Sequence, residues 1–202
     1  MRISNRFDKH IVAAATVAMS AVAANASVVT WGCNLVIPNS IDGLYINIEA
    51  QTYGSVGNLV SGWDINPYGA SSDKIQWLPS PYPSPNGYVI GFGQGGTTAA
   101  VASLSGGTVV GAASTFDRTA SSVTAGGWML NAANYFGFKF FTADGLVHYG
   151  YGVMTTGATL GVRTLTSVSY ESVAGVGITV VPAPGALVLL GFAGIASRRR
   201  RN

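Results

Sequence analysis

Cysteine, histidine and charge are all scarce in this sequence. Among 202 residues there is one cysteine, Cys33, so no intrachain disulfide can form. Of the two histidines, His10 lies in an N-terminal segment that reads as a targeting signal, which leaves His148 alone in the rest of the chain. A multi-histidine metal site or a histidine-dependent catalytic triad therefore has little support, and we expect no enzyme. Stability must come from an apolar core.

The charged residues, 9% of the chain, are unevenly distributed. The whole chain carries a net charge of +3, but between residues 27 and 180 four cations stand against seven acids, a net charge of −3. This region has no basic stripe, which argues against nucleic-acid binding. Its acids are too scattered to nominate the carboxylate pair of a glycosidase; they are Asp42, Glu49, Asp64, Asp73, Asp117, Asp144 and Glu171.

The first 26 residues have the three parts of a secretory signal peptide. Three cations precede an apolar run over residues 11–24, and Ala24-Asn25-Ala26 fits the small-residue rule for cleavage. A membrane anchor would need a longer apolar run. We therefore expect residues 1–26 to form a signal helix that is removed after Ala26.

The last 22 residues, 181–202, are organised in a similar way. Pro182-Ala183-Pro184-Gly185 is followed by an apolar run to residue 197 and by four arginines. As a helix the run would be about 20 Å long, short of the ~30 Å hydrocarbon core, unless residues 176–181 extend it. The arginines would stay on the cytoplasmic side and leave the preceding chain outside. The alternative is a buried core helix with a solvated basic end.

This tail resembles the PEP-CTERM sorting signal of Gram-negative bacteria. The resemblance rests on Pro182, Ala183, Pro184, Gly185, Arg198, Arg199, Arg200 and Arg201. Ala183 stands where the commoner form of the signal has glutamate. The resemblance implies a partner, an exosortase-like membrane enzyme that recognises the tail and cleaves near the Pro-x-Pro. It also implies transient residence in the inner membrane before delivery to the cell surface or extracellular matrix.

Residues 27–180 are predicted to form one all-β domain, a β-sandwich or jelly roll of roughly eight to ten strands. The stretch is rich in Gly, Ser, Thr, Val and aromatic residues, and its apolar segments are short and separated by turn residues. Strands are expected at 28–33, 43–51, 88–91, 160–173 and 178–180, with short edge strands on either side of a turn at 105–107. Residues 62–69 are predicted to be a turn-rich connection anchored by Trp63, and 79–85 a proline-rich loop.

The clearest unit is a predicted hairpin, residues 135–141 and 146–153, joined at Asp144-Gly145. A two-residue loop would pair Phe140 with Tyr149, Phe138 with Tyr151 and Phe136 with Val153, and so create one aromatic face. A four-residue loop would keep the same faces together. His148 would then face away from the aromatic side, close to Phe141, in a hydrogen-bonded structural role.

The same hairpin takes part in a second resemblance. Segments 42–47, 62–68, 135–138, 148–151 and 169–172 resemble the ordered landmarks of a domain that recurs in PEP-CTERM proteins, in which His-Tyr-Gly-Trp is commoner than the His-Tyr-Gly-Tyr found here. That resemblance implies a shared β fold and no activity.

Other motifs carry little chemistry. Residues 91–96 satisfy G-x-G-x-x-G, but no βαβ unit surrounds them, so they do not indicate a dinucleotide site. Calcium is the one cofactor left open, because Asp42, Asp64, Asp73 and Asp144 lie in loops, although in no D-x-D-x-D-G array. The tryptophans Trp63, Trp77 and Trp128 are expected mainly in the core, with sugar stacking as the alternative.

Together these features predict an exported, non-catalytic surface or matrix protein. Through the PEP-CTERM resemblance, it is associated with exopolysaccharide and biofilm. The rival hypothesis is a secreted module that binds or cleaves carbohydrate. Ice binding, known for some proteins with similar tails, lacks the regular threonine array that it would need.

Overall fold

The computed structural model describes residues 27–79, 88–92, 100–117, 121–122 and 126–182. Within them the regular structure is almost entirely β-strand, with one short 3-10 helix, η1 (Gly57–Leu59), so the all-β prediction is confirmed. No helix in this part of the chain is long and apolar enough to cross a membrane. The predicted signal helix and the predicted hydrophobic helix of the tail lie outside the described residues.

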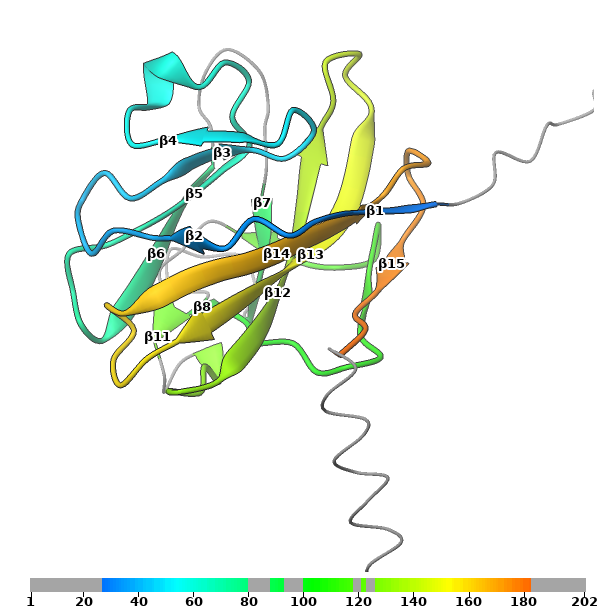
Figure 1. Cartoon of the computed structure of the whole chain (residues 1–202). Coiled ribbons are helices and arrows are strands. Elements are labelled where there is room, and N and C mark those ends of the chain that lie inside the picture. The colour runs from blue at the N-terminus through cyan, green and yellow to red at the C-terminus, as the bar shows by residue number, and fades with distance from the viewer. Residues whose placement is uncertain (1–26, 80–87, 93–99, 118–120, 123–125, 183–202) are drawn as a thin grey trace, which may run out of the picture.

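The larger sheet has eight antiparallel strands (Figure 1). Its members are β1 (Val28–Trp31), β2 (Leu35–Val36), β7 (Tyr88–Phe92), β8 (Ala100–Val101), β10 (Phe116–Asp117), β12 (Ala133–Phe141), β13 (Val147–Thr156) and β14 (Arg163–Glu171). They follow the order β1-β14-β13-β12-β7-β10, with β2 also paired to β14 and β8 to β7. The first strand of the chain therefore lies beside the last long one.

The second sheet has five strands in the order β11-β6-β5-β3-β4. These are β3 (Tyr45–Asn47), β4 (Thr52–Gly54), β5 (Ile65–Tyr68), β6 (Lys74–Pro79) and β11 (Ser121–Ser122). A separate pair joins β9 (Val109–Val110) to β15 (Ile178–Thr179). The described residues thus hold fifteen strands rather than the eight to ten predicted.

Several predictions of strand position are confirmed and two are wrong. Of the strand expected over 43–51 only Tyr45–Asn47 is formed, because residues 48–51 form a turn that leads into β4. The strands expected near 28–33, 88–91, 160–173 and 178–180 are present, and the Thr108 N–H donates to Ser105 O at 3.2 Å in the predicted turn. The stretch 62–69 is not only a connection, because it contains β5. Trp63 does anchor it, since its side chain is buried. Of the proline-rich loop, only Pro79 is described, as the last residue of β6.

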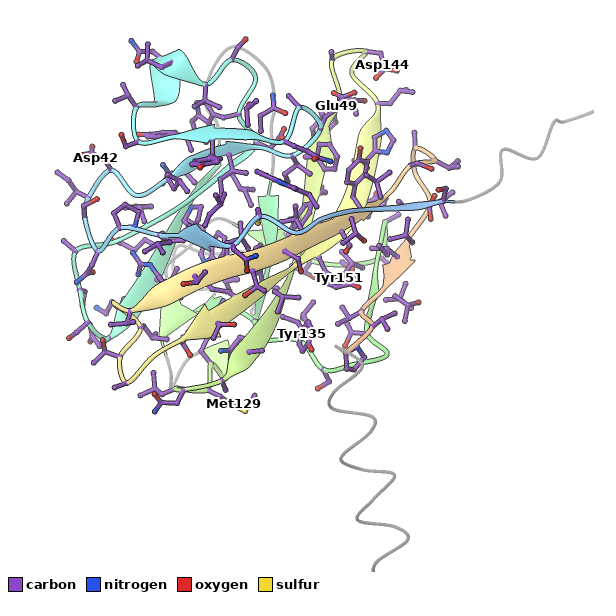
Figure 2. The ribbon with its side chains drawn as sticks, viewed as in Figure 1. Asp42, Glu49, Met129, Tyr135, Asp144 and Tyr151 are labelled. Atoms are coloured by element: carbon purple, nitrogen blue, oxygen red, sulfur yellow. The ribbon has the colours of Figure 1, made fainter. Side chains whose placement is uncertain are left out.

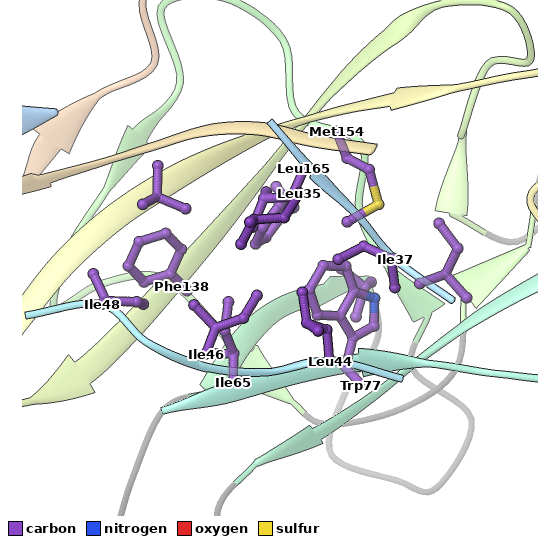
Figure 3. Close-up of a cluster of buried hydrophobic side chains, with 14 of the residues drawn as sticks. Leu35, Ile37, Leu44, Ile46, Ile48, Ile65, Trp77, Phe138, Met154 and Leu165 are labelled. Atoms are coloured by element: carbon purple, nitrogen blue, oxygen red, sulfur yellow. The ribbon is translucent and has the colours of Figure 1, made fainter. Parts of the chain in front are cut away.

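The main core lies between the two sheets (Figure 3). Ile46 and Trp77 of the five-stranded sheet meet Phe136 and Phe138 of the larger one, and the rings of Trp77 and Phe136 lie 4.5 Å apart. Burying each large apolar side chain stabilises the fold by roughly 2 kcal/mol. The cluster comprises Leu35, Ile37, Leu44, Ile46, Ile48, Ile65, Ile75, Trp77, Val101, Trp128, Phe136, Phe138, Phe140, Met154, Leu160, Leu165 and Val168.

A second cluster covers the opposite face of the larger sheet. Tyr149 and Tyr151 of β13 are buried there against Val110 and Ile178, which come from the β9–β15 pair. Tyr135 of β12 lies beside Tyr151, with ring centroids 6.5 Å apart (Figure 2). The central hairpin is therefore buried on both faces, and the β9–β15 pair serves as a cover.

The hairpin is present, but its predicted register was wrong by one residue. Phe140 pairs with His148, Phe138 with Gly150 and Phe136 with Gly152. Because paired residues share a face, the phenylalanines and the tyrosines lie on opposite faces of the sheet rather than on one. The single aromatic face predicted from the sequence is in fact two faces.

The loop explains this shift. The Thr142 N–H donates to Leu146 O at 3.0 Å, and the Gly145 N–H donates to Thr142 O at 2.8 Å, which closes a three-residue loop. Gly145 has a φ of +81°, whereas Asp144 is not among the residues with positive φ, so the Asp-Gly pair does not form the two-residue type I′ turn. An odd loop length moves every side chain of β13 to the other face.

The new register places glycine under each phenylalanine ring. A Cβ on Gly152 would lie under 3.0 Å from the ring of Phe136, and one on Gly150 would meet the ring of Phe138 equally closely. Both rings are fully buried in the core between the sheets. The absence of a side chain at Gly150 and Gly152 is therefore a packing requirement.

A buried arginine joins the two sheets at one end. Arg163, 2% exposed, donates through Nη1 to Lys74 O and Leu160 O, both at 3.2 Å, and through Nη2 to Pro38 O at 3.1 Å and Gly69 O at 3.0 Å. Its Nε atom has no partner among the described residues. Burial lowers the pKa of Arg163 to about 10, so the side chain stays charged at neutral pH.

We expect Gly152→Ala to destabilise the protein by about 1–3 kcal/mol, because the new methyl group overpacks the ring of Phe136. Gly32→Ala is the matched control, since a Cβ there meets nothing within 4 Å. Urea unfolding of both variants gives the comparison. Equal stabilities for the two would contradict the packing.

Candidate functional site

Of the residues predicted to form the sorting signal, the structure describes only Pro182. Its ring packs on Gly106, and the preceding strand is held by hydrogen bonds from Gly107 N to Val180 O at 2.9 Å and from Val180 N to Thr108 O at 2.8 Å. The chain is therefore attached to the β domain up to the first proline of the motif. The other predicted residues, Ala183, Pro184, Gly185 and Arg198 to Arg201, lie outside the described residues. So do Ala24 and Ala26 of the predicted cleavage site.

The described part of the chain has a polar hollow of about 280 Å³ at the end of the central hairpin. It lies beside the hairpin loop, and Figure 2 shows Glu49 and Asp144 close together there. Two carboxylates, a histidine and a tyrosine contribute to it, and no lysine or arginine lines it. Its lining residues are Glu49, Thr142, Asp144, Leu146, His148, Tyr170, Ser172 and Ala174.

Backbone and side-chain hydrogen bonds hold the acidic side of this hollow. Asp144 Oδ1 accepts from Thr142 Oγ1 at 2.5 Å and from Leu146 N at 3.2 Å, and the first of these bonds is the main reason that the pKa of Asp144 is lowered. Glu49, from the segment after β3, accepts from Ala143 N at 3.3 Å. The loop therefore presents Asp144 as a carboxylate at neutral pH.

His148 forms the inner wall of the hollow, contrary to its predicted orientation. The register places its ring on the Phe140 side, 5.6 Å from that ring and 6.1 Å from the ring of Tyr170. Its Nδ1 lies 2.8 Å from Glu171 O. Because a carbonyl can only accept, Nδ1 must carry a proton. The hydrogen-bonded role predicted for this histidine is confirmed.

The hollow does not assemble a nucleophilic triad from the described residues. Ser172, the only serine in its lining, has its Oγ 3.5 Å from Glu171 Oε1, and no hydrogen bond joins it to His148. Tyr170 has a raised pKa, first because of burial and then because of the charge of Glu49, so its phenol stays protonated. The arrangement suits hydrogen bonding to a ligand better than attack on one.

The four aspartates considered for calcium are not brought together. Among the described residues no three His, Cys, Asp or Glu side chains are placed to hold a metal ion. Asp73 bonds to the neighbouring Ser71 hydroxyl, and this bond is the main cause of its lowered pKa. Asp42 contributes its backbone carbonyl to Asn66 Nδ2 at 2.8 Å. Calcium binding stays a hypothesis.

Asp64 is a buried acid, 2% exposed. Its Oδ2 accepts from Ile48 N at 2.7 Å, yet burial, and to a lesser extent the charge of Glu49, raises its pKa to about 7. The sequence placed this residue in a turn. Nothing in the local pattern indicated that its carboxyl lies inside.

The tryptophans of the expected core are buried, as predicted. Trp63, Trp77 and Trp128 are between 1% and 8% exposed, and Trp128 Nε1 donates to Val101 O at 2.8 Å. Trp31 is only half-buried, and its ring lies 6.5 Å from that of Tyr53, which is 54% exposed. Of the described tryptophans, Trp31 is therefore the one with a ring partly open to solvent.

Cys33 is a free thiol beside the main core. It is half-buried, its Sγ donates to Leu165 O at 3.3 Å, and burial raises its pKa above the ordinary value. A thiol in this state is a weak nucleophile. These contacts indicate a structural role for Cys33.

Comparison with known proteins adds no constraint, because no family model, curated protein or solved structure matches this chain.

We expect Asp64→Asn to change how stability depends on pH. The folded protein holds the Asp64 proton more tightly than the unfolded chain, whose pKa is near 3.8, so stability falls as pH rises from about 4 to about 7. Asparagine keeps an acceptor for Ile48 N–H without a charge. The variant should therefore gain on the order of 3 kcal/mol over the parent at pH 8 and nothing at pH 4.

Chemical unfolding at the two pH values measures this difference. Asp42→Asn, at a position whose contact is made by the backbone, is the matched control and should leave the pH dependence unchanged. A parallel pH profile for Asp64→Asn and the parent would contradict the assignment.

Proposed function

We propose that this chain is an exported, non-catalytic β-sandwich protein that an exosortase-like enzyme sorts to the cell surface or extracellular matrix. There it would act together with exopolysaccharide in biofilm. The proposal starts from the two terminal segments of the sequence, each of which has the composition of a targeting signal.

The observation that carries the proposal is the way the β domain meets these segments. Ser27, the residue after the predicted cleavage site, is hydrogen-bonded to the end of β14 on both sides: its N–H donates to Glu171 Oε1 at 2.9 Å, and its carbonyl accepts from Ser172 N at 2.9 Å. At the other border Val180 bonds to Gly107 and Thr108. These contacts tie Ser27 and Val180 into the β domain, which supports a folded body between the two terminal segments.

The chemistry of the described residues supports a non-catalytic role. The hollow at the hairpin loop has no activated nucleophile, and the buried charged groups Arg163 and Asp64 are bonded to the backbone. A β domain that needs no disulfide is compatible with a role in an extracellular matrix.

Fractionation and intact mass of the protein expressed in a Gram-negative host with an exosortase test this route. We expect the mature protein to begin at Ser27, to lack the chain beyond the Pro-x-Pro and to reach the surface. Pro184→Ala should leave an uncut, membrane-held form, because the cleavage motif is altered while the apolar run remains. Ending the chain at Pro182 should release it without membrane retention. Uncut full-length protein in the cytosol would contradict the proposal.

A carbohydrate-binding module is the second candidate, and the polar hollow favours it. Glu49 and Asp144 can accept from sugar hydroxyls, and Tyr170 adds an aromatic surface.

A glycan array probed with the purified mature protein tests this candidate. If it is right, Glu49→Gln should weaken the binding of a selected glycan at least tenfold, because a carboxylate acceptor is replaced by an amide. Asp42→Asn, remote from the hollow, should bind as the parent does. No selective binding, or equal loss in both variants, would reject the module.

A further inference from the structure

Glu171 is a nearly buried carboxylate, 4% exposed, at the end of β14. Its Oε1 accepts from two backbone amides, Ser27 N at 2.9 Å and Val173 N at 3.1 Å, and lies 3.5 Å from Ser172 Oγ. No cation among the described residues pairs with it. All of its donors are neutral in the unprocessed chain, although a buried carboxylate is stabilised far more by a positive charge.

One of these donors changes its charge if the chain is processed as proposed. Hydrolysis of the Ala26–Ser27 peptide bond by a signal peptidase adds water across that bond: the hydroxyl goes to the Ala26 carbonyl carbon and a proton to the Ser27 nitrogen. Protonation of the resulting amine from solvent gives an ammonium at neutral pH, since an α-amino group has a pKa of about 7.7–8.0. The Ser27 nitrogen then carries the positive charge that Glu171 lacks.

We infer that Glu171 is the binding site for the new N-terminus. Removal of the signal peptide would then form an ion pair between the Ser27 ammonium and the nearly buried Glu171 carboxylate, at the edge of the eight-stranded sheet. This inference rests on the cleavage in the proposed function. The geometry is prepared beforehand, because Ser27 O already accepts from Ser172 N and β1 is paired with β14 from Val28 onward. None of these contacts involves a residue before Ser27.

The pair has a structural consequence for the edge of the sheet. β1 has only four residues and lies at the margin of the eight-stranded sheet, so its first residue would otherwise fray. A charge-assisted bond at Ser27 fixes the start of β1 against β14. The processed protein should therefore be more stable than a form with extra residues at this end.

A thermodynamic cycle tests the inference on the chain 27–202 in detergent. One form starts at Ser27, released by a protease from an N-terminal fusion, and a matched form keeps Ala26 as its first residue, which moves the ammonium by one residue. Each is made with Glu171 and with Glu171→Gln, which keeps an oxygen acceptor but removes the charge. We expect the added alanine to raise the unfolding equilibrium constant about tenfold with Glu171 and to have little effect with Glu171→Gln.

Acetylation of the Ser27 amine is a second measurement, because it removes the charge without lengthening the chain by a residue. It should destabilise the Glu171 form and leave the Glu171→Gln form nearly unchanged. Equal effects of the extension or of acetylation in both backgrounds would overturn the inference, as would no effect in either.

N-terminal sequencing of the protein recovered from cells separates this inference from the proposed function. A mature protein starting at Ser27 supports both. A start at another residue overturns the terminus-binding role of Glu171 while export stands. Retention of residues 1–26 overturns the export route, and the ion pair formed by the designed Ser27 terminus is then not a feature of the natural protein.

Discussion

The central hairpin must be buried on both faces, and the rest of the fold follows from that constraint. β12 and β13 present phenylalanines to the core between the sheets and tyrosines to the cluster under β9 and β15. Glycines at positions 150 and 152 leave room for the rings on the inner side. With one cysteine in the chain, no intrachain disulfide can add to the stability that this double packing provides. The hairpin is therefore covered on both faces, by the five-stranded sheet on one side and by β9 and β15 on the other.

Three buried charged groups at the margin of this core are accommodated in different ways. Arg163 is surrounded by backbone carbonyls, which solvate a cation without a counter-charge. Asp64 is held by one amide and takes up a proton more readily than an exposed aspartate. Glu171 stays beside the nitrogen of Ser27. The hydrogen bonds of each group join segments that are distant in sequence. These groups therefore fix the arrangement of the loops around the apolar core.

Sequence patterns predicted the fold class and the hairpin, because alternation and turn residues are local signals. They could not predict the register, since Asp144-Gly145 is compatible with loops of different length and the structure uses the three-residue form. β5 was missed because Asn66 and Pro67 resemble a turn, although both are buried in a strand. Arg163 could have been assigned to the inner face, because it precedes Leu165 by two residues in an alternating strand.

The polar hollow was beyond such reasoning for a different physical reason. Glu49 and Tyr170 are more than a hundred residues apart, and only the packing of the sheets brings them to the same place. Isolated residues of this kind carry no periodicity. The same holds for the contact between Ser27 and Glu171, which joins the two ends of the domain across 144 positions.

The pairing of β1 with β14 has a consequence for how the protein forms. Val28 to Trp31 are made before the rest of the β domain, yet their partners, Val168 to Glu171, are among the last residues of the domain to be synthesised. The opening strand must therefore wait, without a neighbour on the sheet, until nearly the whole domain has been made. Because this pairing joins residues so far apart in sequence, we expect β1 to join the sheet slowly and late in folding. The edge of β14 that β1 will cover stays open until that late step.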